Sequence, residues 1–527
     1  MSDATGAATN GAVGDQIGGT VGDGRARPEP LLSELSRSGR VGHLLTSPDN
    51  CRDATSDLPS ELLRDDLPLP ELGELDVVRH FTHLSTLNHS IDHGFYPLGS
   101  CTMKYNPKVN EDVARLPGFA QLHPYQPEES VQGALEVMWE LERVLAAVTG
   151  FDRVTLQPAA GAQAELCGML LIREYHRARN DAKRTKVLIP DSAHGTNPAT
   201  AAMCGYTTVS IPTDAHGNVD LDRVKREADE TTVGLMLTNP NTLGLFEQQI
   251  LEVTDAVHKA GGLVYGDGAN LNAILGAVKP ADLGFDVMHI NTHKTFSTPH
   301  GGGGPGCGPV AVRSILEPYL PTPVVARRDD GSFLLDWDRP DSIGKLKAFW
   351  GHFGVMVRAL TYITRQGDQG LRDISEAAVL NANYLKARLQ DVYDVPFDRS
   401  CMHEFVASGK RQRQHGVRTL DIAKRLIDFG IHPPTVYFPL IVEEAIMVEP
   451  TEGENKDTLD RFVEVMRQIA REAEEDPDVV RAAPHNRVVG RLDEATAARR
   501  PVLRWSWDDA RTANESGAGS ATPSGRS

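Results

Sequence analysis

Two polar side chains, each placed just after a short apolar run, are the residues of this sequence best suited to chemistry. Asp267 follows the run 263–265, and Lys294 follows the run 287–290. Such runs are typical of buried parallel strands, which present reactive groups at their C-terminal ends. A buried lysine and an aspartate together suit pyridoxal phosphate (PLP), because the amine can form a Schiff base with the aldehyde and the carboxylate can keep the pyridine nitrogen protonated. The two residues alone leave open an ordinary ion pair between surface loops.

A second candidate feature is the start of a helix that could bind an anion. The short predicted strand 154–157 is followed by small residues and by a long helical segment that begins near Ala162. The free N–H groups and the dipole of a helix N-terminus attract phosphate. Gly161, Ala162 and Gln163 are therefore predicted to bind the cofactor phosphate, with a plain strand–helix turn as the alternative. No Gly-Lys-Ser/Thr follows, so this is not a Walker loop.

Strands and helices alternate through the middle of the chain. Strands are predicted at 186–191, 207–212 and 233–247, the last ending in a polar turn, and helices at 220–229 and 250–261. This alternation predicts a mainly parallel sheet with helices on both faces. Polar side chains follow the strands and should meet at one edge of the sheet: His194, Asn239, Asn241, Thr242, Asp267 and Lys294. The histidine of this set could stack flat on a pyridine ring, cap a helix or pack in the core.

The character of the sequence changes after about residue 321. A hairpin is predicted at 327–337, helical stretches at 344–365 and 375–393, and mixed strands and helices beyond, which indicates a second, α+β domain. A helix is also predicted before the sheet, at 129–148. The predicted organisation has five parts: a disordered tail (1–28), an extended arm (29–125), a large cofactor-binding domain (126–325), a small α+β domain (326–505) and a second disordered tail (506–527).

Composition narrows the class of protein. The 527 residues carry a formal net charge of -18, which argues against nucleic acid or an anionic membrane as the main partner. The six cysteines form no C-x-x-C pair, and neither a signal sequence nor a long apolar run is found, so a cytoplasmic location is expected. His89 and His93 are four residues apart, but no completing ligand is evident, and no metal is predicted.

Eight motifs carry a resemblance that extends over about residues 75–505: GFYPLGSCTMKYNPK (94–108), LQPAAGAQAE (156–165), DSAHGTNPA (191–199), NPNTLGLFE (239–247), DGANLNAI (267–274), NTHKTFSTPHGGGGPG (291–306), CMHEFV (401–406) and EPTEGENKDTLDRF (449–462). The chain resembles the P-proteins of the glycine cleavage system. Within that family it is similar to the C-terminal-half subunit of the two-subunit form, glycine dehydrogenase (decarboxylating) subunit 2. The first 70 residues have no counterpart in this resemblance.

The resemblance implies a fold and a set of residue roles. The fold would be PLP-dependent transferase fold type I, with a mainly parallel, seven-stranded-type sheet and a smaller α+β C-terminal domain. Lys294 would bind PLP, Asp267 would pair with the pyridine nitrogen and His194 would stack on the ring. Further cofactor contacts are expected from Gly161, Ala162, Gln163, Thr292, His293, Asn239 and Thr242. Thr292 stands where the family has a serine, and Ala159 and Ala160 stand where it often has Asn and Ser, which weakens side-chain contacts from that loop.

The implied activity is PLP-dependent decarboxylation of glycine, with transfer of the aminomethyl group to the lipoyl arm of H-protein. The implied partner is a subunit 1, in a heterotetramer of two copies each. His403, Lys104 and Arg504 are candidates to bind the glycine carboxylate. The alternatives are another fold-type-I PLP enzyme, such as an aminotransferase, cysteine desulfurase or amino-acid decarboxylase, and a non-catalytic scaffold subunit. A Rossmann domain is disfavoured, because no G-x-G-x-x-G follows the first strand.

Overall fold

The structure, a computed structural model, describes residues 28–42, 58–64, 69–300, 306–350 and 352–504. Apart from Pro28, the predicted tails 1–28 and 506–527 lie outside these residues. The chain divides into two compact units, one of residues 29–481 and one that contains residues 1–28 and 482–527. The elements below belong to the larger unit unless stated otherwise.

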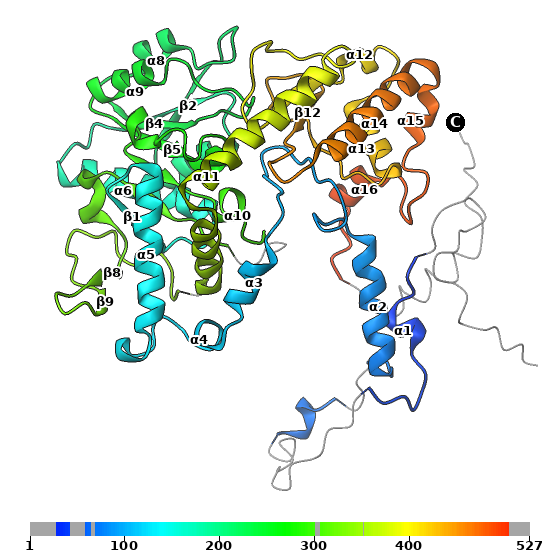
Figure 1. The fold of residues 1–527 in the computed structure, drawn as a ribbon, viewed down its shortest axis with the longest axis horizontal. Helices are drawn as coiled ribbons and strands as arrows, with labels where there is room; N and C mark the ends of the chain where they lie inside the picture. The colour runs from blue at the N-terminus through cyan, green and yellow to red at the C-terminus, as the bar shows by residue number, and fades with distance from the viewer. Residues whose placement is uncertain (1–27, 43–57, 65–68, 301–305, 351, 505–527) are drawn as a thin grey trace, which may run out of the picture. The chain divides into compact units, whose positions relative to one another are not determined.

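The largest sheet among the described residues has seven strands (Figure 1), in the order β1-β7-β6-β5-β4-β2-β3. All neighbouring pairs are parallel except those that β7 makes with β1 and β6. The prediction of a mainly parallel, seven-stranded sheet is confirmed. The strands are β1 (Arg153–Thr155), β2 (Lys186–Pro190), β3 (Thr207–Ile211), β4 (Thr232–Thr238), β5 (Leu263–Asp267), β6 (Val287–His289) and β7 (Val310–Val312).

Apolar side chains cover both faces of this sheet. Successive residues of a strand point to opposite faces, so neighbours on one strand pack in different clusters. On β5, Val264 packs in one core cluster, whereas Leu263 and Tyr265 pack in another. The first cluster includes side chains of α5 (Gln132–Thr149) and α9 (Ile250–Lys259), and the second includes side chains of α6 (Gly161–Ala178) and α7 (Thr196–Met203). The sheet is thus covered by helices on both faces, as strand–helix alternation predicted. The helix α8 (Leu221–Glu227) lies between β3 and β4 in the chain.

A smaller antiparallel sheet follows later in the chain, with the order β10-β12-β11. Its strands are β10 (Phe405–Ser408), β11 (Thr435–Val436) and β12 (Ala445–Val448), and a shared apolar cluster joins it to α13 (Thr419–Asp428) and α14 (Lys456–Glu475). This part has the α+β character that was predicted. The predicted hairpin is formed by β8 (Val324–Arg327) and β9 (Phe333–Asp336). The domain boundaries at residues 125 and 325 stay predictions.

One long helical element, α11 (Phe353–Leu389), replaces the two predicted helices, with a break at Gly367, where φ is 65° and ψ is -174°. The prediction that residues 344–350 are helical is wrong. Gly344 has a φ of 85°, and the indole N–H of Trp350 donates to the carbonyl of Leu156 at 3.1 Å. Contacts with distant parts of the chain therefore override the local helical pattern in this segment.

A helix that was not predicted, α2 (Glu74–Leu87), precedes the histidine-containing loop. His89 and His93 lie beyond its end, so they do not share a helix face. His89 Nε2 lies 3.0 Å from the carbonyl oxygen of Phe95, and its ring packs against Tyr96. His89 therefore contacts the loop that follows α2 through both its Nε2 atom and its ring.

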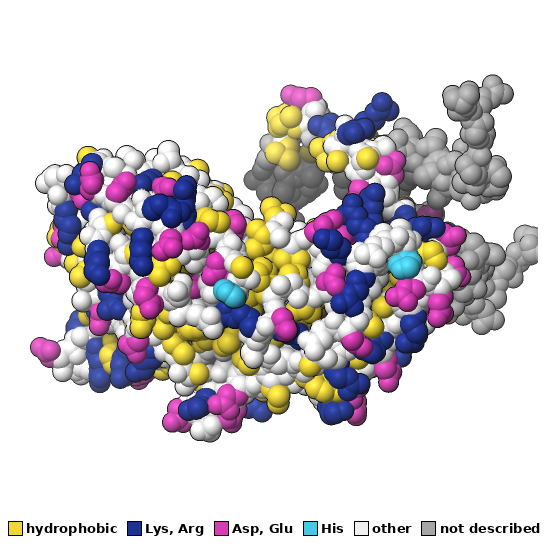
Figure 2. Space-filling view, turned by 90° about the horizontal axis from the view of Figure 1, so that it is seen from above, with side chains coloured by type: hydrophobic (Ala, Val, Ile, Leu, Met, Phe, Trp, Pro, Cys, Tyr) yellow, Lys and Arg dark blue, Asp and Glu magenta, His cyan; other side chains and the backbone are white. Residues whose placement is uncertain are grey.

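The described part of the smaller unit, residues 482–504 with Pro28, contains the short helix α16 (Glu494–Arg499). None of the helices in the described ranges has the length and apolar character needed to cross a membrane. On the face of the molecule shown in Figure 2, Lys and Arg side chains lie interspersed with Asp and Glu.

Candidate active site

The C-terminal ends of four neighbouring strands meet at one pocket of about 230 Å³. Thr238 ends β4 and Asp267 ends β5. Lys294 lies on the short helix α10 (Thr292–Thr295), which follows β6, and His194 lies in the loop that follows β2. All four line the pocket. The edge at which a parallel sheet presents its reactive groups is therefore hollowed where the sequence predicted polar side chains.

Seven of the ten predicted site residues line this pocket: Gly161, Ala162, His194, Thr242, Asp267, His293 and Lys294. The side chains of the other three are bonded elsewhere in the protein: Gln163 Oε1 accepts from Ala159 N at 2.7 Å, Thr292 Oγ1 donates to Cys307 O at 3.0 Å, and Asn239 Oδ1 accepts from Glu247 N at 3.0 Å. These three hold the pocket walls, and their predicted cofactor contacts stay predictions.

The amine of Lys294 is held by a distant loop. Lys294 Nζ donates to the carbonyl oxygen of Ser100 at 2.7 Å, and Ser100 also lines the pocket. Ser100 has a φ of 65°, a left-handed conformation that is uncommon for a residue other than glycine. Strain of this kind gathers at functional sites, and here it directs a backbone carbonyl at the one lysine that lines the pocket.

The carboxylate of Asp267 is backed by a chain of buried polar groups. Asp267 Oδ1 accepts a hydrogen bond from Ala269 N at 3.0 Å and lies 3.4 Å from His289 Nε2. On its other side, His289 Nδ1 lies 2.5 Å from the hydroxyl of Tyr265. Burial lowers the pKa of His289 and raises the pKa of Tyr265 well above its usual value. The tyrosine thus keeps its proton and can donate to Nδ1, an arrangement in which Nε2–H faces the aspartate.

The start of α6 closes another wall of the pocket. A Cβ atom on Gly161 would lie 2.4 Å from Asn291 Oδ1, so a side chain here would require Asn291 to move. The N–H groups in the first turn of a helix have no acceptor within the helix. In the same pocket, Thr238 Oγ1 and Asn270 Oδ1 are buried with no hydrogen-bond partner among the described residues. Buried polar groups are normally bonded, so this pocket is built to receive a polar ligand.

His194 stands exposed at the pocket wall, which rules out the alternative that it packs in the core. Its Nδ1 accepts from Thr196 N at 3.3 Å and lies 2.9 Å from Thr196 Oγ1, next to the start of α7. The rings of His194 and Phe438 form a T-shaped pair with centroids 5.9 Å apart. Bonding to Thr196 thus fixes Nδ1 of His194 at the pocket wall.

Glu165 is a pocket residue that sequence reasoning did not single out. It is 2% exposed, it lines the pocket from α6, and its Oε1 accepts from Asn197 Nδ2 at 2.9 Å. Burial, followed by the nearby charge of Asp267, raises the pKa of Glu165 to about 7. The group therefore exchanges its proton near neutral pH.

This raised pKa predicts a pH-dependent effect of Glu165→Gln on the cofactor-free protein. The folded state binds the proton more tightly than the unfolded state, so wild type loses stability as the pH rises from about 4.5 to about 7. Glutamine cannot ionise, and the variant should gain on the order of 2 kcal/mol relative to wild type between about pH 5 and about pH 8. Urea unfolding measures the difference. Glu474→Gln, at an exposed site on α14, is the control, and a change equal to that of the control would contradict the assignment.

The three candidates for binding a substrate carboxylate fare differently. Lys104 is unsuited, because its Nζ donates to three protein acceptors: Glu452 Oε1 at 2.8 Å, Asn272 Oδ1 at 2.9 Å and Thr295 O at 2.9 Å. His403 is fully buried and does not line the pocket. Arg504 is exposed and belongs to the smaller unit.

Eight further residues complete the pocket wall: Ser100, Glu165, Thr196, Thr238, Ala269, Asn270, His289 and Asn291. Most of them lie within motifs that the sequence analysis noted. Thr238 and His289 were missed because they are strand residues themselves. Ser100 and Glu165 lie at no strand end, so their position in the sequence gave no such signal.

Comparisons with known proteins agree with this architecture. The family described as "Glycine cleavage system P-protein" matches residues 49–332, and that described as "Glycine dehydrogenase, C-terminal domain" matches residues 374–489. A protein of Halalkalibacterium halodurans named "Probable glycine dehydrogenase (decarboxylating) subunit 2" is 60% identical over 481 residues, 91% of this chain and 98% of that protein. A protein of the same name from Exiguobacterium sibiricum is 60% identical over 479 residues, 90% and 97% of the two chains.

Solved structures share the fold. A crystal structure of glycine decarboxylase (P-protein) of the glycine cleavage system, in inhibitor-bound form, matches with a TM-score of 0.67 at 22% identity, over 79% of this chain and 94% of that one. The sphingosine-1-phosphate lyase of Burkholderia pseudomallei matches with a TM-score of 0.59 at 12% identity, over 81% and 97% of the two chains. On the strength of the family match and the close relatives, this chain belongs to the glycine cleavage system P-protein family.

Proposed function

We propose that this chain is a PLP-dependent glycine decarboxylase, the catalytic subunit of a two-subunit P-protein. The observation that carries the proposal is that Asp267, Lys294 and the N-terminus of α6 line one pocket at the C-terminal edge of the sheet. The relatives at 60% identity are named for this activity. The aminomethyl group that remains would pass to the lipoyl arm of an H-protein.

The residues present fit the cofactor. The N–H groups in the first turn of α6, which have no acceptor within the helix, suit a phosphate. Asp267 suits a protonated pyridine nitrogen, and Lys294 suits a covalent bond to the aldehyde carbon. Thr238 Oγ1 and Asn270 Oδ1, which lack partners among the described residues, supply further polar contacts. Gln163, Thr292 and Asn239 would act behind this wall, through the bonds that fix its backbone.

Each residue has a distinct part in the chemistry. When bound, PLP accepts the electron pair of the bond between the glycine Cα and its carboxylate, so that CO2 can leave. Asp267 holds a negative charge where the pyridine nitrogen must stay protonated, and the His289–Tyr265 pair behind it orients the carboxylate. His194, which lines the same pocket, would stack on the ring. The carbonyl of Ser100 accepts a hydrogen bond from Lys294 and would hold this amine whenever it is not bound to the cofactor.

The name of the relatives, subunit 2, implies a multi-subunit assembly. The finer arrangement, two copies of this chain with two copies of a subunit 1, is part of this proposal, as are the H-protein partner and the cytoplasmic location. Size-exclusion chromatography of the co-expressed chains is expected to show one complex. Separate elution of the two chains would contradict the heterotetramer.

The activity itself is tested by the near-visible absorption of the purified protein with PLP, followed by a panel of amino acids. A Schiff-base band should form, and glycine alone should shift it, as the names of the relatives imply. Exchange of the glycine carboxylate with bicarbonate, dependent on H-protein and subunit 1, should follow. A shift with aspartate, alanine or cysteine instead would favour another fold-type-I enzyme, and the absence of any band in the assembled complex would favour a scaffold subunit.

A further inference from the structure

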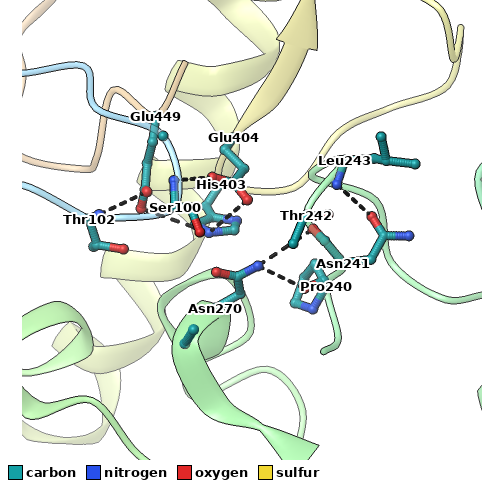
Figure 3. Close-up of polar contacts among 12 residues, drawn as sticks. Ser100, Thr102, Pro240, Asn241, Thr242, Leu243, Asn270, His403, Glu404 and Glu449 are labelled. Carbon is teal, nitrogen blue, oxygen red and sulfur yellow. Dashed lines mark hydrogen bonds and ion pairs between the residues drawn. The ribbon is translucent and has the colours of Figure 1, made fainter. Parts of the chain in front are cut away.

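A buried cluster behind Lys294 has no part in the chemistry described so far. His403 and Glu404 precede β10 and Glu449 follows β12, and because Phe405 pairs with Val448, the two glutamates flank the same end of the small sheet. All three side chains are 0% exposed. His403 Nε2 lies 3.9 Å from Glu404 Oε1 and 3.8 Å from Glu449 Oε1, so the side chains face one another (Figure 3). These two carboxyl oxygens and both ring nitrogens lack a hydrogen-bond partner among the described residues.

The other oxygen of each carboxyl group holds the loop that reaches Lys294. Glu404 Oε2 accepts from Ser100 N at 2.7 Å, and Glu449 Oε2 accepts from Thr102 N at 2.9 Å (Figure 3). Ser100 and Thr102 have φ angles of 65° and 49°, so both are non-glycine residues in the left-handed region. Such conformations persist only where the surroundings enforce them. The two buried glutamates are therefore bonded to the two strained positions of this loop.

The same loop is fixed to the small sheet by its backbone. Leu98 forms an isolated antiparallel bridge with Val448, and a Cβ atom on Gly99 would lie 2.2 Å from Met447 Cγ. The loop thus lies directly on β12 before it turns toward the pocket. Its last link is the bond from Lys294 Nζ to the Ser100 carbonyl. An unbroken set of contacts connects β10 and β12 with the pocket amine.

We propose that Glu404 and Glu449 are positioning residues for Lys294: as a clamp, their buried carboxyl groups hold Ser100 and Thr102 in the conformation in which the Ser100 carbonyl accepts a hydrogen bond from the amine. The proposal rests on the proposed function for the role of that amine. The clamp itself is a property of the cofactor-free chain.

The clamp also holds a proton near neutral pH. The titratable or charged groups around the two carboxyls are Lys294, His403, Cys101 and Glu452. Lys294 supplies one positive charge, and burial lowers the pKa of His403 to about 3, so the ring is neutral. Burial raises the pKa of Glu404 well above its usual value and that of Glu449 to about 7. Both carboxyls therefore stay protonated below about pH 7. Because burial disfavours their charged form, ionisation above about pH 7 destabilises the clamped arrangement relative to an open one.

The test measures how fast Lys294 is reductively methylated in the cofactor-free chain, by peptide mass, with the exposed Lys225 of the same sample as internal reference. Wild type should react slowly at about pH 6 and faster than its reference predicts above about pH 7, where the clamp loses its proton. Glu404→Ala and Glu449→Ala should raise the rate at about pH 6 by about tenfold, the effect of losing a hydrogen bond to a charged group. Glu449→Gln should keep the slow rate and lose the extra rise, because its amide oxygen still accepts from Thr102 N and cannot ionise.

Glu142→Gln, which replaces another buried glutamate, on α5 and away from this loop, is the matched control and should behave as wild type. If the alanine variants do not fold, Glu449→Gln still tests the proposal. In this variant the rate at Lys294, divided by the rate at Lys225, must not rise above about pH 7. Rates and profiles of all variants within twofold of this control would overturn the clamp. Elemental analysis adds a separate outcome: one equivalent of a divalent metal in wild type that is lost in Glu449→Gln would replace the proton by a metal ion and overturn the proposal. The methylation measurement needs no PLP. Its result can therefore be interpreted even if the proposed glycine decarboxylase activity is not found.

Discussion

Lys294→Ala is expected to abolish covalent cofactor binding and to lower glycine decarboxylation by at least about 10³-fold. Lys294 is the lysine that lines the pocket, and its amine already points at the Ser100 carbonyl on the pocket wall. Without it, PLP can bind only by non-covalent contacts, and no amine remains to accept the aldehyde after turnover. The loss of the Schiff-base band and of the borohydride-labelled peptide around residue 294 would measure the effect.

The matched control is Lys347→Ala. Lys347 also has an amine suited to such a bond, because burial lowers its pKa to about 8, but it does not line the pocket and lies 2.5 Å from His352 Nδ1. This variant should keep the band and most of the activity. Borohydride labelling of the peptide around residue 347, with Lys294→Ala still active, would overturn the assignment of the pocket lysine.

The large sheet could be predicted from the sequence because its signals are local. The buried strands β4 and β5 are continuous apolar runs, and the helices between the strands carry apolar positions at helical spacing. In a parallel sheet the C-terminal ends of neighbouring strands lie at the same edge. The sequence therefore predicts that Asp267, His194 and Lys294 lie at one site. The close set of family motifs added the roles of these residues.

The parts that could not be predicted depend on contacts between distant segments. Ser100 lies 194 positions from Lys294 in the chain, and no local pattern indicates that its carbonyl faces that amine. The segment 344–350 was predicted to be helical from its residue types. It is not helical, and the indole N–H of Trp350 instead donates a hydrogen bond to the carbonyl of Leu156. Lys104 looked suited to bind a carboxylate until its three acceptors were known. In each case the decisive partner comes from another part of the fold, which residue types and spacing do not specify.

Asp267→Asn is expected to have the second largest effect, a loss of about 10²-fold or more in the rate of decarboxylation with the fold intact. Asparagine has nearly the same shape and can still accept from Ala269 N. It lacks the negative charge that keeps a pyridine nitrogen protonated, so the ring would be a poorer electron acceptor. Because binding contacts remain, kcat should fall far more than KM rises, and the absorption spectrum of the bound cofactor should change.

The matched control for this charge is Asp286→Asn. Asp286 is also a buried aspartate next to β6, but its Oδ2 accepts from Val264 N and lies 2.7 Å from His258 Nε2, outside the pocket. Its replacement should lower stability, since it removes the negative charge that lies 3.9 Å from the guanidinium Nε of Arg313, and should leave kcat and the cofactor spectrum near those of wild type. If both variants lowered kcat equally, the effect would reflect a general loss of buried charge. If Asp267→Asn kept full activity, another group would have to keep the pyridine nitrogen protonated. The nearest candidate is His289, whose Nε2 lies 3.4 Å from Asp267 Oδ1 in the wild-type chain.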